Sequence, residues 1–271
     1  MTRIALFQMT AGIDPARNAD AIAAAAREAA GEGAAMLFTP EMSGLLDRDR
    51  VRAAGLIARE GDEPVLAATC EAAARDGIWI ALGSLAIDRG DDKWANRSYL
   101  IGPDGTIAAR YDKVHMFDVD LASGESWRES NAYKPGNEVV TAQTLLGRIG
   151  LAICYDLRFP ALFEALGRHS CDAIAIPAAF TVPTGEAHWH VLQRARAIEA
   201  SAYVIAAAQV GEHEDGRRTY GHSLVVDPWG EVLLDMGGER TGVGFAEIDT
   251  ERIAQARRQV PSLANRREIA N

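Results

Sequence analysis

The chain alternates short apolar runs with amphipathic stretches along almost its whole length. A short apolar run bounded by turn residues predicts a buried strand, whereas apolar residues three and four positions apart predict a helix. Helices are therefore expected at residues 18–32, 63–75, 160–169, about 187–202 and 251–259. Strands are expected at residues 3–9, 35–39, 78–84, 97–101, 106–111, 139–145, 148–153, 173–176, 204–209, 223–226, 231–234 and 243–248. This alternation is typical of an α/β fold and predicts a single domain over residues 1–271.

Composition supports a folded domain and argues against several kinds of partner. With 271 residues, of which 48% are hydrophobic, the chain can bury a large core and is no candidate for disorder. Its net charge of −10 argues against nucleic-acid binding, although local arginines can still attract a small anion. No apolar stretch reaches membrane-spanning length, and the N-terminus is too short and too strand-like for a signal peptide. The sequence thus predicts no nucleic-acid partner and no membrane partner.

The three cysteines indicate a reducing environment. They cannot all be paired, and their spacing suits no zinc site, so a cytoplasmic location without a bound metal is expected. Cys70 lies on a helical pattern and Cys171 begins a strand, which favours packing roles for both.

Cys154 differs from the other two, because it ends an apolar run that starts at Gly150. A polar segment follows, and Pro160 can then open a helix. Such a strand-to-helix elbow presents its side chain at the carboxyl end of a sheet, where α/β folds place their sites. The helix start should bring backbone N–H groups toward the sulfur and favour the nucleophilic thiolate. Taken alone, however, a cysteine here is more simply a small buried hydrophobe.

Two charged residues also stand where predicted strands end. Glu41 follows the apolar run at 35–38, and Lys113 follows the strand that ends at Tyr111. Each alone would be a solvated loop charge or half of an ion pair. With Cys154 they have complementary chemistry: Glu41 can take the thiol proton, Lys113 can stabilise an oxyanion, and the sulfur can attack a carbonyl or nitrile carbon.

At this point the sequence resembles the nitrilase, or carbon–nitrogen hydrolase, superfamily over essentially its whole length. The segments that carry the resemblance are 111–115, 150–160, 187–189, 194–199 and 220–230. Members of this family use a Glu–Lys–Cys triad in this chain order, and the matching residues are Glu41, Lys113 and Cys154. Many members carry a further glutamate between the lysine and the cysteine, which matches Glu129, with Glu125 as the nearby alternative.

The resemblance implies a four-layer α-β-β-α sandwich, in which two mixed sheets are flanked by helices. It also implies a homodimer or higher homo-oligomer, because members usually pair through helices beside the active site. The C-terminal tail, about residues 260–271, has too few apolar residues for a core of its own. We therefore expect it to reach a partner subunit.

The implied reaction is acyl transfer through a thioester on Cys154. Glu41 would move the proton, while Lys113 and the backbone N–H of Tyr155 would hold the oxyanion. Glu129 would orient the site during hydrolysis of the thioester. No cofactor, metal or organic, is expected, because the sulfur supplies the covalent chemistry.

The predicted substrate is a small-molecule amide, most simply the amide of an α-keto acid. The tracts 195–199, 203–209 and 220–223 look most like the deaminated glutathione amidase branch, followed by omega-amidases that act on 2-oxoglutaramate. Arg158 is the candidate for the substrate carboxylate, with an ion pair to Asp156 as the alternative. The predicted wall residues are Tyr155, Phe180 and Thr184.

Several other polar residues receive structural interpretations. His188 and His190, at a helix start, fit either a site wall or helix packing. His222 is expected to be a buried hydrogen-bonding residue, and His115 to hold the Lys113 segment in place. Asn18 is the candidate cap of the first helix. The charged run at 212–218 is interpreted as a solvated loop.

Other functions remain compatible with the same residues. A nitrilase or a carbamoyl amidohydrolase would use the same triad, so that only substrate profiling separates them from a keto-acid amidase. A non-catalytic interaction protein on this fold is the alternative from a different class. It is disfavoured because a scaffold needs no thiol, ammonium and carboxylate at three strand ends.

Overall fold

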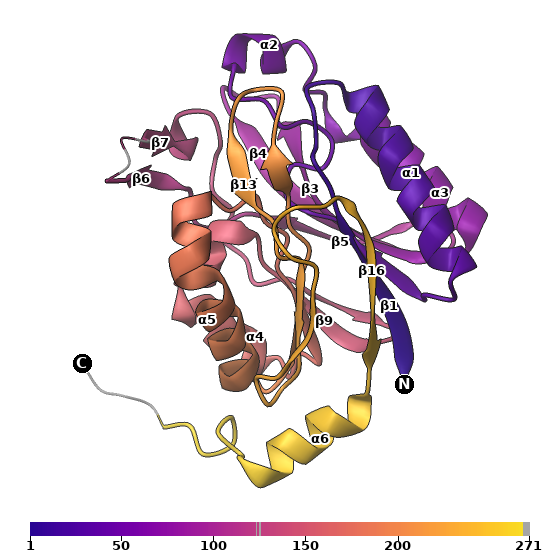
Figure 1. Cartoon of the computed structure of the whole chain (residues 1–271), viewed down its shortest axis with the longest axis vertical. Coiled ribbons are helices and arrows are strands. Elements are labelled where there is room, and N and C mark those ends of the chain that lie inside the picture. Colours follow the sequence, from indigo (N-terminus) through magenta and orange to yellow (C-terminus); the bar gives the residue numbers. More distant parts are fainter. Residues whose placement is uncertain (123, 125, 268–271) are drawn as a thin grey trace.

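Two six-stranded sheets form the centre of the protein. The computed structural model describes residues 1–122, 124 and 126–267. The first sheet has the order β16-β1-β2-β3-β4-β5, and the second has the order β15-β14-β11-β10-β9-β8. Each sheet contains parallel and antiparallel pairs. Helices α1 and α3 cover one outer side and α4 and α5 the other, so the predicted four-layer α-β-β-α sandwich is confirmed (Figure 1).

The elements have the following bounds. The first sheet contains β1 (Thr2–Gln8), β2 (Met36–Phe38), β3 (Trp79–Asp88), β4 (Trp94–Ile101), β5 (Ile107–Asp112) and β16 (Gly242–Ile248). The second contains β8 (Thr141–Thr144), β9 (Gly147–Leu151), β10 (Ala173–Ala175), β11 (Tyr203–Ala206), β14 (Leu224–Val226) and β15 (Val232–Asp235). Two small hairpins are β6 (Asp118–Asp120) with β7 (Ser126–Arg128), and β12 (Val210–Glu212) with β13 (Arg218–Tyr220). The helices are α1 (Pro15–Gly31), α2 (Arg50–Ala54), α3 (Pro64–Asp76), α4 (Pro160–Arg168), α5 (Val182–Ala200) and α6 (Thr250–Gln259), with 3-10 turns η1 (Glu60–Asp62), η2 (Glu129–Asn131) and η3 (Cys154–Arg158).

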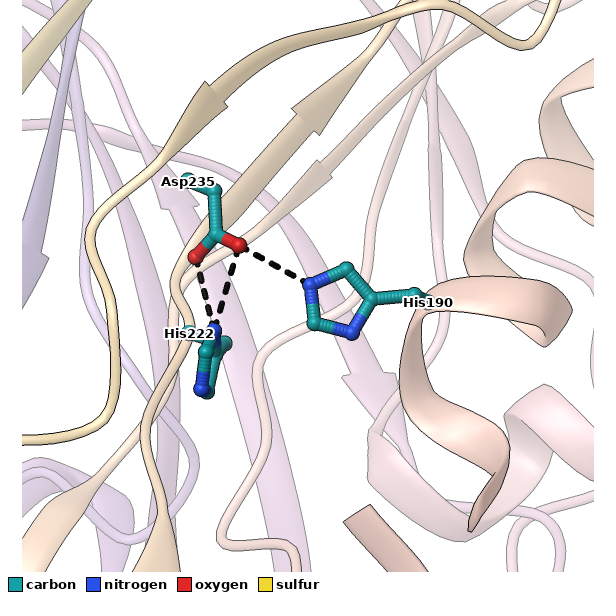
Figure 2. Close-up of side chains that lie close together, drawn as sticks. All are labelled: His190, His222 and Asp235. Carbon is teal, nitrogen blue, oxygen red and sulfur yellow. Dashed lines mark hydrogen bonds and ion pairs between the residues drawn. The ribbon is translucent and has the colours of Figure 1, made fainter. Parts of the chain in front are cut away.

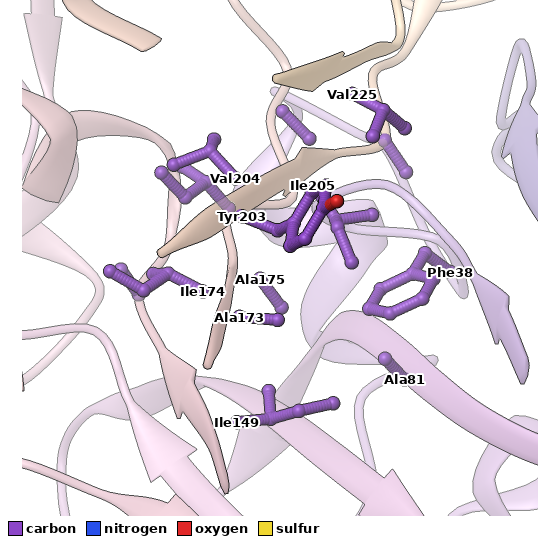
Figure 3. Close-up of a cluster of buried hydrophobic side chains, with 14 of the residues drawn as sticks. Phe38, Ala81, Ile149, Ala173, Ile174, Ala175, Tyr203, Val204, Ile205 and Val225 are labelled. Carbon is purple, nitrogen blue, oxygen red and sulfur yellow. The ribbon is translucent and has the colours of Figure 1, made fainter. Parts of the chain in front are cut away.

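The main core lies between the two sheets. Phe38 and Ala81 of the first sheet belong to one buried cluster with Ala173, Ala175 and Ile205 of the second (Figure 3). Ala81, Ala173 and Ala175 are small and leave room for the larger side chains of Phe38 and Ile205 in this cluster. Truncating a buried aromatic of this kind costs about 3–5 kcal/mol. The packing therefore fixes the relative position of the two sheets, on which the site below depends.

The first helix begins earlier than predicted. Asp14 caps it, accepting a hydrogen bond from the Ala16 N–H at 2.9 Å, and Pro15 occupies the first helical position. Asn18 is therefore not the cap. It is buried inside α1, where it receives the Gly12 N–H at 3.0 Å and donates to the carbonyl of Gly44 at 2.9 Å. The prediction was wrong because an asparagine that precedes an alanine run has the sequence signature of a cap, even when its side chain binds the backbone of another segment.

Two further boundaries differ from the prediction. Helix α5 starts at Val182 rather than near residue 187, because Pro183 is compatible with the first helical turn. The charged run 212–218 forms the ends and the turn of the β12–β13 hairpin, where Glu212, Glu214 and Arg218 are exposed as expected but His213 and Asp215 are buried. His213 is buried there between the Ala11 carbonyl and the Thr219 hydroxyl, at 2.9 and 2.8 Å. Burial lowers the pKa of His213, so this histidine is neutral near pH 7.

The C-terminal segment returns to its own chain as far as the structure describes it. After α6, Leu263 lies beside Gly167 of α4, and Arg266 donates to the Glu164 carbonyl at 3.2 Å. Residues 268–271 lie outside the described residues, so the expected contact with a partner stays a prediction. Within the described ranges, no helix combines the length and the apolarity that crossing a bilayer requires.

Candidate active site

Glu41, Lys113 and Cys154 meet although they come from different sheets. Glu41 follows β2 and Lys113 follows β5, both in the first sheet, while Cys154 follows β9 in the second. All three are buried, with 5%, 2% and 7% exposure. The Lys113 ammonium lies 2.8 Å from Oε1 of Glu41. The structure thus brings together the three residues that the sequence placed at strand ends.

The backbone is strained at two points of this site. Cys154 has a φ of 45° and Met42, directly after Glu41, has a φ of 55°. Residues with side chains rarely adopt this left-handed region because it is strained. At functional sites the packing of the surrounding structure offsets the strain energy. The Cys154 N–H donates to the Pro177 carbonyl at 2.9 Å, which helps to hold the elbow. With this conformation the chain leaves the extended course of β9 and begins the turn η3 at Cys154.

A network of hydrogen bonds fixes the acid and the ammonium. Lys113 donates to Glu129 at 2.9 and 3.2 Å, in addition to Glu41. The Asn96 amide donates to both glutamates, at 2.9 Å to Glu41 and 3.0 Å to Glu129. The Ala179 N–H reaches the other oxygen of Glu41 at 3.0 Å. One ammonium is therefore shared by two carboxylates, with the amide of Asn96 between them.

The electrostatics favour ionised Glu41 and Lys113. Burial would raise the pKa of Glu41, but the charge of Lys113 and its hydrogen bond lower it, so that the pKa lies below its ordinary value. Burial would lower the pKa of Lys113, but the charges of Glu129 and Glu41 raise it well above its ordinary value. Both groups are charged across the neutral pH range.

The cysteine behaves differently from the sequence expectation. Burial and the neighbouring charge of Glu41 raise the pKa of Cys154 well above its ordinary value, although Lys113 acts in the opposite direction. The resting form is therefore the thiol and not the thiolate. The short turn η3 does not compensate for the negative charge of Glu41. A base must accordingly remove the proton during attack, and Glu41 interacts directly with the thiol.

Asp156 joins the lysine segment to the nucleophile turn. This fully buried carboxylate accepts hydrogen bonds from the Tyr111 hydroxyl at 2.7 Å and from the Ile153 N–H at 2.9 Å. It also accepts from the His115 N–H at 3.0 Å, and its Oδ1 lies 2.7 Å from the His115 ring. The expectation that His115 holds the Lys113 segment matches this contact. Both oxygens of Asp156 are used by these hydrogen bonds, and among the described residues Asp156 forms no ion pair with Arg158.

A cavity of about 720 Å³ opens onto Cys154. Three predicted wall residues, Tyr155, Phe180 and Thr184, are among its lining residues. Arg158 is not: its guanidinium is 3.1 Å from His188 Nδ1 and lies over the Phe180 ring. The sequence interpretation of Arg158 as the carboxylate-binding residue therefore has no support from its position.

Other arginines line the cavity and make it locally positive despite the net charge of the chain. They are Arg48, Arg50, Arg128, Arg217 and Arg218. Arg217 pairs with Asp215 at 2.8 Å and lies over the Trp127 ring, and Arg128 pairs with Asp120 at 2.7 Å. Arg218 forms no ion pair with any carboxylate of the described residues. The side chains of Arg48 and Arg50 likewise pair with no described carboxylate, and the Arg50 guanidinium donates only to the Arg128 carbonyl at 2.6 Å, so the charges of these three arginines are left for a ligand.

Sequence reasoning missed Asn96 and Ala179. Asn96 is the third residue of β4 and is buried, whereas the predicted strand began at Arg97 and left Asn96 outside it. Ala179 contributes only its backbone, so that no side-chain pattern could reveal it. Glu125, the alternative to Glu129, lies outside the described residues.

The remaining candidates lie away from the thiol. Cys70 is partly buried on α3 and Cys171 is buried before β10, as expected for packing residues. His222 is half-buried rather than buried, and it contacts Asp235 together with His190.

An α-β-β-α sandwich with a cysteine, a lysine and two glutamates at the floor of one cavity defines a cysteine hydrolase of the nitrilase type. The family model for carbon-nitrogen hydrolase matches residues 3–258. The chain belongs to the carbon–nitrogen hydrolase family.

Relatives and solved structures agree with this assignment. The deaminated glutathione amidase of Yersinia enterocolitica is 37% identical over 271 residues, covering 99% of this chain and 94% of the relative. The NitFhit protein of C. elegans superposes with a TM-score of 0.90 at 36% identity, over 98% of this chain and 65% of that longer protein. A mutant amidase from Nesterenkonia sp. AN1, with acrylamide added at its active site cysteine, superposes with a TM-score of 0.81 at 26% identity, over 96% of this chain and 98% of that one.

Proposed function

We propose that this protein is an amidase that hydrolyses deaminated glutathione through a thioester on Cys154. The observation that carries the proposal is the shared Lys113 ammonium, held between Glu41 and Glu129 beside a neutral thiol. This arrangement supplies a nucleophile, a base and a positive charge at one point of the cavity.

The first half of the reaction forms the thioester. Glu41 takes the thiol proton while the sulfur of Cys154 bonds to the amide carbon, and the carbonyl oxygen becomes an oxyanion. Lys113 and the backbone N–H of Tyr155 stabilise this oxyanion; the Tyr155 N–H has no acceptor among the described residues. A donor of this kind contributes on the order of 3 kcal/mol to barrier lowering. The C–N bond then breaks, and protonated Glu41 gives its proton to the leaving amine.

The second half releases the acid. A water molecule enters where the amine has left, and Glu41 takes one of its protons as its oxygen bonds to the thioester carbon. The C–S bond breaks, and the sulfur recovers its proton from Glu41. Glu129 keeps Lys113 in place throughout, because it binds the same ammonium as Glu41 and does not take part in the proton transfers.

The cavity fits a substrate with several carboxylates. Deaminated glutathione and 2-oxoglutaramate carry the same keto-acid acyl group and differ in the leaving group, which is cysteinylglycine in one and ammonia in the other. Discrimination must therefore come from the leaving-group side. A cavity of about 720 Å³ with arginines along its wall has room and charge for a dipeptide. The name of the Yersinia relative points to the same substrate.

A substrate panel tests this proposal. Deaminated glutathione, 2-oxoglutaramate, a simple nitrile and a carbamoyl amide are assayed with the purified protein under equal ionic strength, since exposed charge contacts weaken with salt. We expect the highest kcat/KM for deaminated glutathione. A preference for 2-oxoglutaramate would reassign the enzyme as an omega-amidase. Activity on the nitrile or the carbamoyl amide alone would refute the substrate class while leaving the cysteine chemistry standing.

We also propose that the protein is a cytoplasmic homodimer. Val191 and Ile198 on α5 and Trp229 after β14 are half or more exposed, which suits burial against a second subunit. Free cysteines are consistent with a reducing compartment. Sedimentation velocity on the purified chain tests the dimer, and a monomer at micromolar concentration would refute it.

A further inference from the structure

A second group of reactive side chains lies outside the Cys154 cavity. His190 of α5, His222 between β13 and β14, and Asp235 at the end of β15 converge from three elements (Figure 2). Their ligand atoms all lie within 4.8 Å of one another. None of the three lines the cavity. The mechanism above makes no use of them.

The geometry of this group is that of a preorganised chelate. His190 Nε2 lies 2.9 Å from Oδ2 of Asp235, and His222 Nδ1 lies 2.9 and 3.1 Å from the two carboxylate oxygens. Both imidazoles thus turn a ring nitrogen toward the same carboxylate, as Figure 2 shows. Ligands of a tetrahedral zinc ion lie about 2.0–2.2 Å from the metal, so a shift of a few tenths of an ångström in each side chain would admit the ion.

The surroundings hold the three side chains in place. The Gly237 N–H donates to Oδ1 of Asp235 at 2.9 Å, which fixes the carboxylate. His222 has a φ of 55°, and the Trp189 indole donates to its carbonyl at 2.8 Å. Its ring stacks on Tyr220 with 4.4 Å between centroids. The hydrogen bond to the Asp235 carboxylate is of the kind that orients a metal ligand and strengthens metal binding.

We propose that His190, His222 and Asp235 form a site for a divalent transition-metal ion, with zinc as the best match. Two imidazoles and one carboxylate suit zinc, and each ring keeps its proton on the nitrogen that faces away from the metal. The side chains are 36%, 24% and 33% exposed, so that water can complete the coordination. The ion would clamp α5 to the β14–β15 hairpin and has no part in amide hydrolysis.

Zinc binding to the full chain tests the site directly. The measurement uses a Cys154→Ala background, so that the active-site thiol cannot contribute a ligand. After removal of metals with a chelator, isothermal titration with zinc chloride should show one site per chain. The thermal midpoint should also rise with zinc concentration, because a ligand that binds only the folded state stabilises it.

Three further variants in the same background decide between a site and a simple hydrogen-bond cluster. His190→Ala and Asp235→Asn should weaken zinc binding at least about tenfold and abolish the thermal shift. His188→Ala, two residues earlier on α5 and exposed, is the matched control and should bind as the background does. Circular dichroism of each variant without metal controls for folding. Absence of zinc binding in the background, or equal binding in all variants, would overturn the proposal.

Discussion

The Nδ1 atom of His115 lies 2.7 Å from Oδ1 of Asp156, and this contact ties the loop after Lys113 to the turn that carries Cys154. The two segments belong to different sheets, so their relative position sets the distance from the ammonium to the sulfur. Tyr111 strengthens the junction by donating to the other oxygen of Asp156 at 2.7 Å. The distance between the Lys113 ammonium and the Cys154 sulfur therefore depends on Asp156, which does not line the cavity.

Substituting Asp156 should reduce stability and turnover together. In Asp156→Asn an amide group replaces one oxygen and meets donors at either position, leaving buried N–H groups unsatisfied. We expect the free energy of unfolding to fall by about 2–4 kcal/mol, measured by urea denaturation. Asp92→Asn, at an exposed position, is the control and should stay within about 0.5 kcal/mol of wild type. Equal free energies of unfolding for the two variants would show that the hydrogen bonds of Asp156 do not stabilise the fold.

Removing the nucleophile should abolish turnover and leave the fold intact. Cys154→Ala deletes one sulfur atom from a cavity wall, which leaves the surrounding strands in place. We expect no hydrolysis above background in a stopped assay with deaminated glutathione, and an unchanged circular dichroism spectrum. Residual activity sensitive to thiol alkylation would point to another cysteine; full activity would exclude the thioester route.

The charged pair should be needed for chemistry rather than for binding. Lys113→Met and Glu41→Gln are each expected to lower kcat by at least about two orders of magnitude, through loss of oxyanion stabilisation and of proton transfer. Steady-state kinetics with both kcat and KM resolved provide the check. Asp92→Asn, at an exposed position outside the cavity, is the control for the loss of a carboxylate in Glu41→Gln. A kcat within a few-fold of wild type in either test variant would exclude the proposed role.

The pH dependence follows from the directions of the pKa shifts. The pKa of Glu41 lies below its ordinary value of 4.5, so its carboxylate persists until the pH falls below that value. The pKa values of Cys154 and Lys113 lie well above 9.0 and 10.5, so neither group loses its proton near neutrality. We expect kcat/KM to be flat from about pH 5 to 9. A basic limb near pH 7 would indicate a different base.

The pH dependence of the stability should follow from the pKa shifts of Glu41 and Lys113. Because the folded-state pKa of Glu41 is depressed, its contribution is fully present above pH 4.5 and is lost as the pH falls through the folded-state value. Lys113 behaves in the opposite sense: its contribution is present below pH 10.5 and is lost as the pH rises further. Thermal unfolding of Glu41→Gln and wild type between pH 3 and 7 measures the first effect, and the difference between them should shrink in acid.

Arg218 should distinguish the two keto-acid amides. It lines the cavity without an ion pair to a described carboxylate, which leaves it for the dipeptide end of the larger substrate. Arg218→Ala is expected to raise KM for deaminated glutathione about tenfold and to leave 2-oxoglutaramate unchanged. Arg27→Ala, at an exposed position of α1 that does not line the cavity, serves as the charge control. An equal effect on both substrates would assign Arg218 to the shared acyl end instead.

The sequence located Glu41, Lys113 and Cys154 at strand ends but missed the residues that hold them there. Glu41, Lys113 and Cys154 each end a strand, and strand ends are visible as the limits of apolar runs. Asn96 was missed because its partners, Glu41 and Glu129, come from remote parts of the chain. The turn at Asp215 was read as solvated because charge is a local property of sequence, whereas its pairing with Arg217 depends on the hairpin.

Folding kinetics give another consequence of a site divided between two sheets. Each sheet can form its own strand pairs. The Cys154 sulfur, however, meets Lys113 and Glu41 only after the first sheet, with Phe38, has packed against the second sheet, with Ala175. Contacts between such distant parts of a chain form late, because loop closure must precede them. During refolding from denaturant, recovery of activity should therefore lag behind recovery of secondary structure. The length of this delay measures how slowly the two sheets pack together.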